Sequence, residues 1–321
     1  MTLDNIVSTL KGAEKIAVLP HISIDGDSLG SSLALAMALK KLNKEVKIYL
    51  SEEIPYIYSF LSGKENTEIY TDQNIVYDVA VALDCGDMGR LGERDFLFNS
   101  AKKTINIDHH KTNTEFAFLN YVDPKSSAVG EIIYQIIKML GAGLDKAAAE
   151  CLYVAIATDT GGFRYSNTTA LTHQIISELI NTGIDVSEIS QKVFETSTLR
   201  KVKLMGFAIE SLELFEHGKV ACLTLTDQDM KKAEAVEEDC DGIVNIARNI
   251  QGVEVAVMLR QRDNGEVKAN LRSKAYVDVS VIAGMFSGGG HKRAAGFTAA
   301  GRVEDIKSKL LDDIKEVLYK V

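Results

Sequence analysis

The sequence predicts an α/β protein: a mainly parallel sheet flanked by helices, then a helical connector and a smaller α/β domain. Two observations predict the first sheet. Continuous apolar runs typical of buried strands alternate with amphipathic helical patterns, as in sheets that helices cover on both faces. The strongest of these runs also end in acidic residues. A third observation, a new series of strand and helix patterns after Gly218, predicts the second domain.

The first domain is expected over residues 1–185 and contains four strand patterns and several helical ones. The expected strands are residues 15–19, 46–50, 78–83 and 104–107. The expected helices are residues 29–42, 127–140, 145–158 and 168–182. Ser126 or Ser127 is a suitable N-cap for the helix that Gly141 ends.

The second domain is expected over residues 216–321. Its expected strands are residues 220–225, 253–259 and 267–271, and its expected helices are residues 241–249, 279–285 and 304–319. Residues 186–215 have an almost unbroken helical pattern, which predicts a rigid connector. We expect the active site in the cleft between the two domains.

The net charge limits the partners. A formal charge of −9 means that the surface as a whole should repel a polyanion, so long duplex nucleic acid is not expected. A small anionic substrate is compatible with this charge, because bound cations reverse the sign inside a cleft.

Cysteine spacing and hydropathy limit the class of protein. The four cysteines are far apart and form no CxxC pair, so no zinc knuckle or disulfide framework is predicted. The longest apolar runs, such as 33–39, are shorter than the roughly 20 residues of a membrane helix. The first residues do not resemble a signal or transit peptide. We therefore expect a cytoplasmic protein without a membrane partner.

The loop after the first strand holds three side chains that can bind a metal ion. His21, Asp25 and Asp27 can converge on one point only if the turn curls back, and Gly26 between the two aspartates allows this. We expect this loop to hold most of one ion and part of a second.

Other strand and helix ends carry further ligands. The carboxyl ends of parallel strands share one edge of an open sheet, which is where such sheets bind ligands. Eight acidic and histidine side chains are therefore expected along this edge: His21, Asp25, Asp27, Asp84, Asp108, His109, His110 and Asp159.

This cluster predicts two divalent ions. Without cations, five carboxylates placed together with at least two imidazoles would be unfavourable, because like charges repel and buried charges lose their hydration. One ion takes about four to six ligands, so two ions that share a bridging aspartate account for the set. Asp84, alone at the end of a central strand, is the expected bridge. Oxygen and nitrogen ligands without thiolate favour manganese over magnesium, iron, cobalt or zinc. Because paired divalent ions stabilise both the attacking and the leaving oxygen in displacement at phosphorus, we expect hydrolysis of a phosphate ester.

Five motifs along nearly the whole chain resemble those of the DHH phosphoesterase superfamily. They are His21-x-x-x-Asp25-Gly26-Asp27-Ser28, Asp84-Cys85-Gly86-Asp87, Asp108-His109-His110, Asp159-Thr160-Gly161, and Gly288-Gly289-Gly290-His291 followed by Ala294-Ala295-Gly296. The last resembles the DHH-associated C-terminal domain. The short two-domain layout is similar to the NrnA-type nanoRNase branch, whose members are oligoribonucleases and 3′-phosphoadenosine-5′-phosphate phosphatases.

The resemblance implies a role for each residue at the edge. His21 and Asp25 would hold the first ion. Three ligands would hold the second, namely Asp27, His109 and Asp159. Asp84 would bridge both ions. Asp108 would lie behind the ligands as an acceptor, and His110 would face the scissile phosphate.

The second domain is expected to recognise the rest of the substrate. The backbone N–H groups of Gly289 and Gly290 can approach a phosphate, and His291 or Arg293 adds positive charge. Arg272 is a second candidate, as a planar donor to phosphate or a stacking partner for a base.

Arg164 follows the glycine pair after Asp159. It either lies near the substrate phosphate or only fixes its loop, and the sequence favours neither.

The resemblance implies an enzyme that hydrolyses very short oligonucleotides, including dinucleotides such as pApA or pGpG, and converts 3′-phosphoadenosine 5′-phosphate to AMP. It is also compatible with a homodimer. Two alternatives stay open: an inorganic pyrophosphatase or polyphosphatase of the same superfamily, and a nucleotide-binding regulator with a silent metal site.

Overall fold

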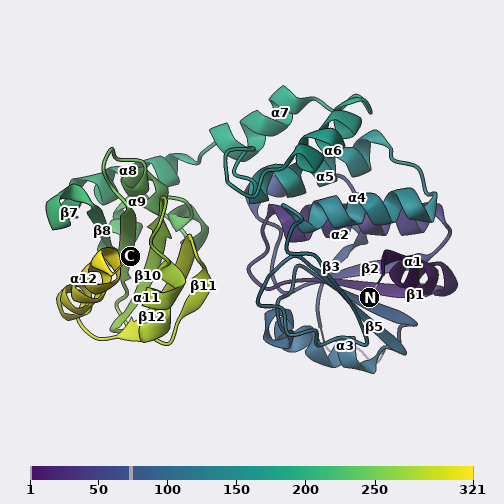
Figure 1. The fold of residues 1–321 in the computed structure, drawn as a ribbon, viewed down its shortest axis with the longest axis horizontal. Coiled ribbons are helices and arrows are strands. Elements are labelled where there is room, and N and C mark those ends of the chain that lie inside the picture. Colours follow the sequence, from purple (N-terminus) through teal and green to yellow (C-terminus); the bar gives the residue numbers. More distant parts are fainter. Residues whose placement is uncertain (1, 72–74, 321) are drawn as a thin grey trace. The chain divides into compact units, whose positions relative to one another are not determined.

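The computed structural model describes residues 2–71 and 75–320, without the side chain of His291. The chain forms two compact units, Met1–Thr196 and Ser197–Val321. Figure 1 shows a sheet with helices on both sides in each of them.

The first unit is built on a six-stranded sheet in which every neighbouring pair of strands is parallel. The order across the sheet is β3-β2-β1-β4-β5-β6. The strands are β1 (Lys15–Pro20), β2 (Glu45–Leu50), β3 (Thr67–Ile69), β4 (Val79–Leu83), β5 (Lys103–Asp108) and β6 (Leu119–Val122). The predicted fold class is confirmed. The two edge strands were not predicted, because three or four residues carry too short a pattern.

The helices of the first unit lie on both faces of this sheet. They are α1 (Leu3–Gly12), α2 (Gly26–Lys41), α3 (Asp95–Ser100), α4 (Val129–Leu140), α5 (Lys146–Asp159), α6 (Ala170–Ile180) and α7 (Val186–Ser190). Short 3₁₀ turns are η1 (Tyr56–Tyr58), η2 (Lys64–Asn66) and η3 (Met88–Arg94). In Figure 1, α2 and α4 cover one face and α3 lies on the other.

Alternation along the strands explains these two layers. Ile16 and Val18 of β1 pack into the larger core with α1, α2, α4 and α5, whereas Ala17 and Leu19 pack into the smaller core with α3. Successive side chains of a strand point to opposite faces, so a strand that is apolar throughout is buried on both. The sheet is thus fixed from two sides, and the ends of its central strands are held in place.

Two glycines of α2 determine how closely this helix packs on α5. A Cβ at Gly30 would overlap the carbonyl oxygen of Cys151, and a Cβ at Gly26 would overlap the side chain of Thr158. Gly26 is absent from the residues of positive φ in the described ranges. Space, and not the curl of the turn that we expected, therefore requires glycine here.

The second unit is a six-stranded mixed sheet with the order β11-β12-β10-β9-β8-β7. Its strands are β7 (Glu213–Phe215), β8 (Val220–Thr226), β9 (Val255–Gln261), β10 (Glu266–Ser273), β11 (Gly289–His291) and β12 (Ala294–Ala300). Its helices are α8 (Leu199–Glu210), α9 (Asp227–Ala233), α10 (Val244–Arg248), α11 (Val279–Met285) and α12 (Val303–Tyr319), with 3₁₀ turns η5 (Glu216–Gly218) and η6 (Glu237–Cys240). The predicted smaller α/β domain is confirmed, including the antiparallel pair β9–β10.

The segment predicted as a connector is divided between the units. After α7 the chain makes a π-helical turn, η4 (Gln191–Glu195), and then leaves the helical conformation at Thr196. Leu204 and Ala208 of α8 lie in a core of the second unit. Residues 186–215 are therefore interrupted rather than one continuous helix.

No helix of the described ranges has both the length and the apolar character that crossing a lipid bilayer requires.

Candidate metal centre

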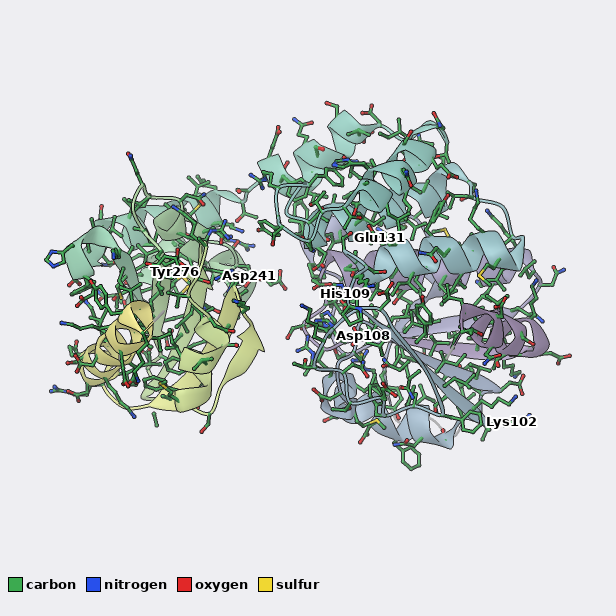
Figure 2. The ribbon with its side chains drawn as sticks, viewed as in Figure 1. Lys102, Asp108, His109, Glu131, Asp241 and Tyr276 are labelled. Carbon is green, nitrogen blue, oxygen red and sulfur yellow. The ribbon has the colours of Figure 1, made fainter. Side chains whose placement is uncertain are left out.

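The predicted ligands of the first unit gather at one edge of its sheet. His21 follows β1, Asp84 follows β4, and Asp108 ends β5. Asp27 lies in the first turn of α2, and Asp159 is the last residue of α5. Figure 2 shows Asp108 and His109 side by side at this edge.

Three overlapping groups of side chains could each hold a metal ion, with ligand atoms within 4.8 Å of one another. The groups are His21, Asp25 and Asp84; Asp27, His109 and Asp159; and Asp84, His109 and His110. Asp84 belongs to two of them. The six side chains expected as metal ligands all belong to these groups, whereas Asp108 belongs to none of them and Asp84 is not grouped with Asp27 and Asp159. The assignment of these side chains to two ions stays a prediction.

The spacing within the groups suits donors that face a common point. His21 Nε2 lies 3.4 Å from Asp84 Oδ2, and His109 Nε2 lies 3.7 Å from both Asp84 Oδ1 and Asp159 Oδ2. These separations exceed ordinary hydrogen bonds. Within the described ranges, the buried Asp84 Oδ1 has no hydrogen-bond partner. A buried carboxylate oxygen without a donor fits a cation, so the donor set suits divalent ions.

Asp84 also has an unusual backbone. Its φ is +59°, in the left-handed region. Strained backbone of this kind costs on the order of 1–3 kcal/mol and is retained mainly at functional sites. Aspartate is among the few side chains that tolerate this region.

The two aspartates that follow β1, Asp25 and Asp27, accept hydrogen bonds from different segments. Asp25 is the N-cap of α2, since its Oδ1 accepts from the Ser28 amide at 2.9 Å. Asp27 is buried and accepts from the Val129 and Gly130 amides at 2.6 and 2.9 Å, which ties it to the start of α4.

Backbone carbonyls orient two of the imidazoles. His21 Nδ1 lies 2.7 Å from the Ile22 carbonyl oxygen, and His109 Nδ1 lies 3.1 Å from that of Ser126. With Nδ1 donating to a carbonyl, each ring presents Nε2 to the cluster as a lone pair for a metal ion.

His110 is oriented differently from the other two imidazoles. Its Nδ1 lies 2.7 Å from Asp108 Oδ1, and Asn113 donates to Asp108 Oδ2 at 2.6 Å. Burial disfavours a charged His110, but the contact with Asp108 outweighs this and raises the pKa of His110 above its usual value. The fully buried Asp108 carboxylate therefore favours the charged form of His110.

Several polar residues that support the site were not predicted. Asn113 and Asn106 both donate to the Cys85 carbonyl, which fixes the loop after Asp84. Asn167 donates to the Ser127 and Asp159 carbonyls at 2.9 and 3.1 Å. These side chains act on backbone carbonyls of distant residues, and no sequence spacing reveals such pairs.

Protons on the ligand side chains offset part of the negative charge that bound cations would otherwise offset. Burial disfavours charge on His21 and His109, but nearby carboxylates outweigh it and raise the pKa of His21 to about 10 and that of His109 to about 9. Burial raises the pKa of Asp159 to about 7, against the attraction of His109, and raises that of Asp27 well above its usual value. Near neutral pH, the raised pKa values therefore favour the charged forms of His21 and His109 and the protonated form of Asp27.

We expect metal uptake to release protons, because each ligand must lose its proton before it binds a cation. Since these pKa values are raised, the affinity for Mn²⁺ should increase as the pH rises from about 6 to 9. Titration calorimetry of Mn²⁺ binding in buffers of different ionisation enthalpy measures the released protons. An affinity that is independent of pH, with the same heat in every buffer, would contradict this expectation.

The candidate substrate residues of the second unit differ in their surroundings. Arg293 donates to the Val277 carbonyl at 2.8 Å, to the Ala275 carbonyl and to Ser273 Oγ. Its guanidinium is thus engaged with the loop after β10. Arg272, at the end of β10, donates to the Leu271 carbonyl at 3.0 Å.

The glycine run forms one strand of the β11–β12 hairpin. A Cβ at Gly288 or Gly290 would overlap backbone atoms of β12, whereas the space around Gly289 is open. The side chain of His291 lies outside the described part of the structure. In the first unit, Arg164 donates to the Gly161 carbonyl at 2.6 Å, which fixes its own loop. The substrate roles of all these residues stay predictions.

Comparison with known proteins adds to this geometry. Residues 15–156 match the DHH family, N-terminal domain, and residues 217–320 match the DHHA1 domain. The chain is 31% identical to the bifunctional oligoribonuclease and PAP phosphatase NrnA of Thermus thermophilus, over 98% of this chain and 94% of that protein. It is 29% identical to the protein of the same name from Bacillus subtilis, over 91% of each. An exopolyphosphatase-related protein from Bacteroides fragilis matches with a TM-score of 0.91 and 29% identity, over 98% of this chain and 97% of that one.

Proposed function

The chain belongs to the DHH phosphoesterase family and is a hydrolase, and from this membership we propose that it cleaves very short oligonucleotides to mononucleotides and converts 3′-phosphoadenosine 5′-phosphate to AMP. The observation that carries the proposal is the complete set of ligand groups around Asp84. The names of the relatives from Thermus thermophilus and Bacillus subtilis support the choice of substrates.

In this proposal the side chains of the centre hold two divalent ions, with manganese favoured by the oxygen and nitrogen donors. His21 and Asp25 would hold the first ion. Asp27, His109 and Asp159 would hold the second, and Asp84 would bridge both. When bound, such a pair supplies an activated water and offsets negative charge on the phosphoryl oxygens.

The protein's own groups would position and protonate the substrate. Asp108 holds His110 through Nδ1, so the opposite edge of the ring, Nε2, is the donor that a substrate can use. A protonated His110 can donate to a phosphoryl oxygen or to the leaving oxygen as the ester bond breaks. We assign His110 this role and Asp108 the role of maintaining its orientation and charge.

The second unit would bind the remainder of the nucleotide. Arg272 can pair with a terminal phosphate or stack on a base, and the open space at Gly289 allows a phosphate to approach the backbone. Arg293 would act through the loop that it holds rather than by touching the phosphate. The acidic exterior of the chain is consistent with a short substrate.

The proposal is tested by direct assay. The protein with Mn²⁺ is expected to release mononucleotides from pApA and from a five-nucleotide RNA, and phosphate from 3′-phosphoadenosine 5′-phosphate. Pyrophosphate and polyphosphate serve as matched controls, because a metal centre of this kind could hydrolyse them if the neighbouring substrate-binding site were of a different type. Rapid phosphate release from either control with no turnover of the nucleotides would overturn the proposal.

A further inference from the structure

One short segment contacts two members of a single ligand group directly and is linked to the third through one side chain. Residues 126–131 form the turn before α4 and its first helical turn. This segment, the 126–131 turn, supplies hydrogen-bond partners to Asp27 and His109 and is linked to Asp159 through Asn167. In Figure 2, Glu131 lies at the start of α4, near His109.

Glu131 is fully buried and holds this turn together. Its carboxylate accepts from the Ser127 amide at 3.0 Å, from Ser127 Oγ at 2.6 Å and from Thr172 Oγ1 at 2.6 Å. A buried carboxylate is costly unless donors surround it, so this arrangement fixes the donors as firmly as the acceptor. Glu131 therefore links the turn to α6 and closes it on itself.

The 126–131 turn forms direct hydrogen bonds with two of the ligands. The Ser126 carbonyl lies 3.1 Å from His109 Nδ1, and so orients the ring. The Val129 and Gly130 amides both donate to the carboxylate of Asp27.

The third ligand is reached through one side chain. Asn167 donates to the Ser127 carbonyl at 2.9 Å and to the Asp159 carbonyl at 3.1 Å. It therefore couples the turn to the last residue of α5.

The other ligand group has separate supports. His21 is oriented by the Ile22 carbonyl, and Asp25 accepts from the Ser28 amide. Neither contact involves residues 126–131. The two groups thus have no residue in common, and different segments support them.

We propose that Glu131 is a positioning residue for one metal ion only, the ion that Asp27, His109 and Asp159 would hold. Glu131 touches neither metal nor substrate and acts through Ser126, Ser127 and the amides at the start of α4. The proposal rests on the proposed ligand set, and it goes beyond the proposed activity because it assigns different determinants to the affinities of the two ions.

The decisive variant is Glu131→Gln, which keeps the shape of the side chain but replaces one acceptor oxygen by an amide donor facing Ser127 or Thr172. Mn²⁺ binding is followed through the electron paramagnetic resonance signal of the unbound ion, without substrate. We expect one class of site to weaken by about 10–100-fold, as for partners behind metal ligands in general, and the other to change less than about twofold. Ser127→Ala, which removes one donor and keeps the backbone contacts, should weaken the same class by less.

Glu254→Gln is the matched control. Glu254 is also a buried carboxylate, and it accepts from the amides of Ala275, Tyr276 and Val277 in the second unit. Its replacement should leave both Mn²⁺ affinities unchanged, although it should lower the unfolding temperature.

Equal weakening of both sites, or of neither, in Glu131→Gln would overturn the proposal. If that variant fails to fold, the same two outcomes in Ser127→Ala decide. The measurement contains no substrate, so a wild-type protein that binds two ions but cleaves no oligonucleotide would overturn the proposed function and leave this inference standing. A wild-type protein with a single class of site would overturn the inference.

Discussion

Replacing Asp84 by asparagine is expected to abolish turnover while leaving the fold in place. Asp84 belongs to two of the ligand groups, and its buried Oδ1 has no hydrogen-bond partner in the described ranges. Loss of a partner behind one ligand costs about 10–100-fold, and in the proposed centre Asp84 would serve two ions, so kcat/KM should fall by at least about 10³-fold. The assay is hydrolysis of pApA at saturating Mn²⁺.

The backbone at Asp84 provides the control. Asparagine tolerates the left-handed region about as well as aspartate, whereas alanine in this region costs roughly 1–2 kcal/mol. Both variants should therefore lose activity, but Asp84→Ala should also lower the free energy of unfolding relative to Asp84→Asn. Substantial activity in a well-folded Asp84→Asn protein would exclude Asp84 as a bridge. It would also favour a centre in which one ion is sufficient.

Replacing Gly30 by alanine should destabilise the first unit, although glycine to alanine usually favours a helix. The new Cβ would overlap the carbonyl oxygen of Cys151, which belongs to the backbone of α5 and has little room to move. Overpacking typically costs about 1–3 kcal/mol. We expect a net loss of about 2 kcal/mol, and weaker Mn²⁺ binding, because α2 carries Asp27 at its start and α5 carries Asp159 at its end.

Gly206→Ala is the matched control for this effect. Gly206 is an exposed residue within α8, and no atom lies within 4 Å of a Cβ built there. This variant should stabilise the second unit by up to about 1 kcal/mol, the usual difference in helix propensity. Denaturant unfolding of both proteins measures the two signs. Equal stabilisation by the two substitutions would show that α2 and α5 separate easily.

The acidic residues at this edge of the sheet were predictable because they follow strands that have clear sequence patterns. Val79–Leu83 is apolar throughout, and Ile105 and Ile107 precede Asp108, so both the sheet and the position of the acids that follow these strands could be inferred. Parallel strands then place these acids together without any knowledge of the loops.

What supports the ligands was not predictable. Glu131 lies in an amphipathic pattern where a lone glutamate is usually exposed, and only the packing of α6 buries it against Thr172. Strand β12 was also missed, because its Ala-Ala-Gly sequence has low strand propensity and its conformation is explained by pairing with β10 and β11. In both cases the cause is tertiary contact with a distant segment.

The placement of Asp159 at the end of α5 has a consequence for synthesis of the chain. A nascent chain contains the whole first ligand group once residue 84 has been made, but the second group is incomplete until residue 159. At about 5–20 residues per second the ribosome takes roughly 4–15 seconds to cover this interval. During that time α2 has no α5 beside Gly26 and Gly30. In the proposed two-ion centre, the two ions would thus differ in the earliest moment at which the growing protein can bind them.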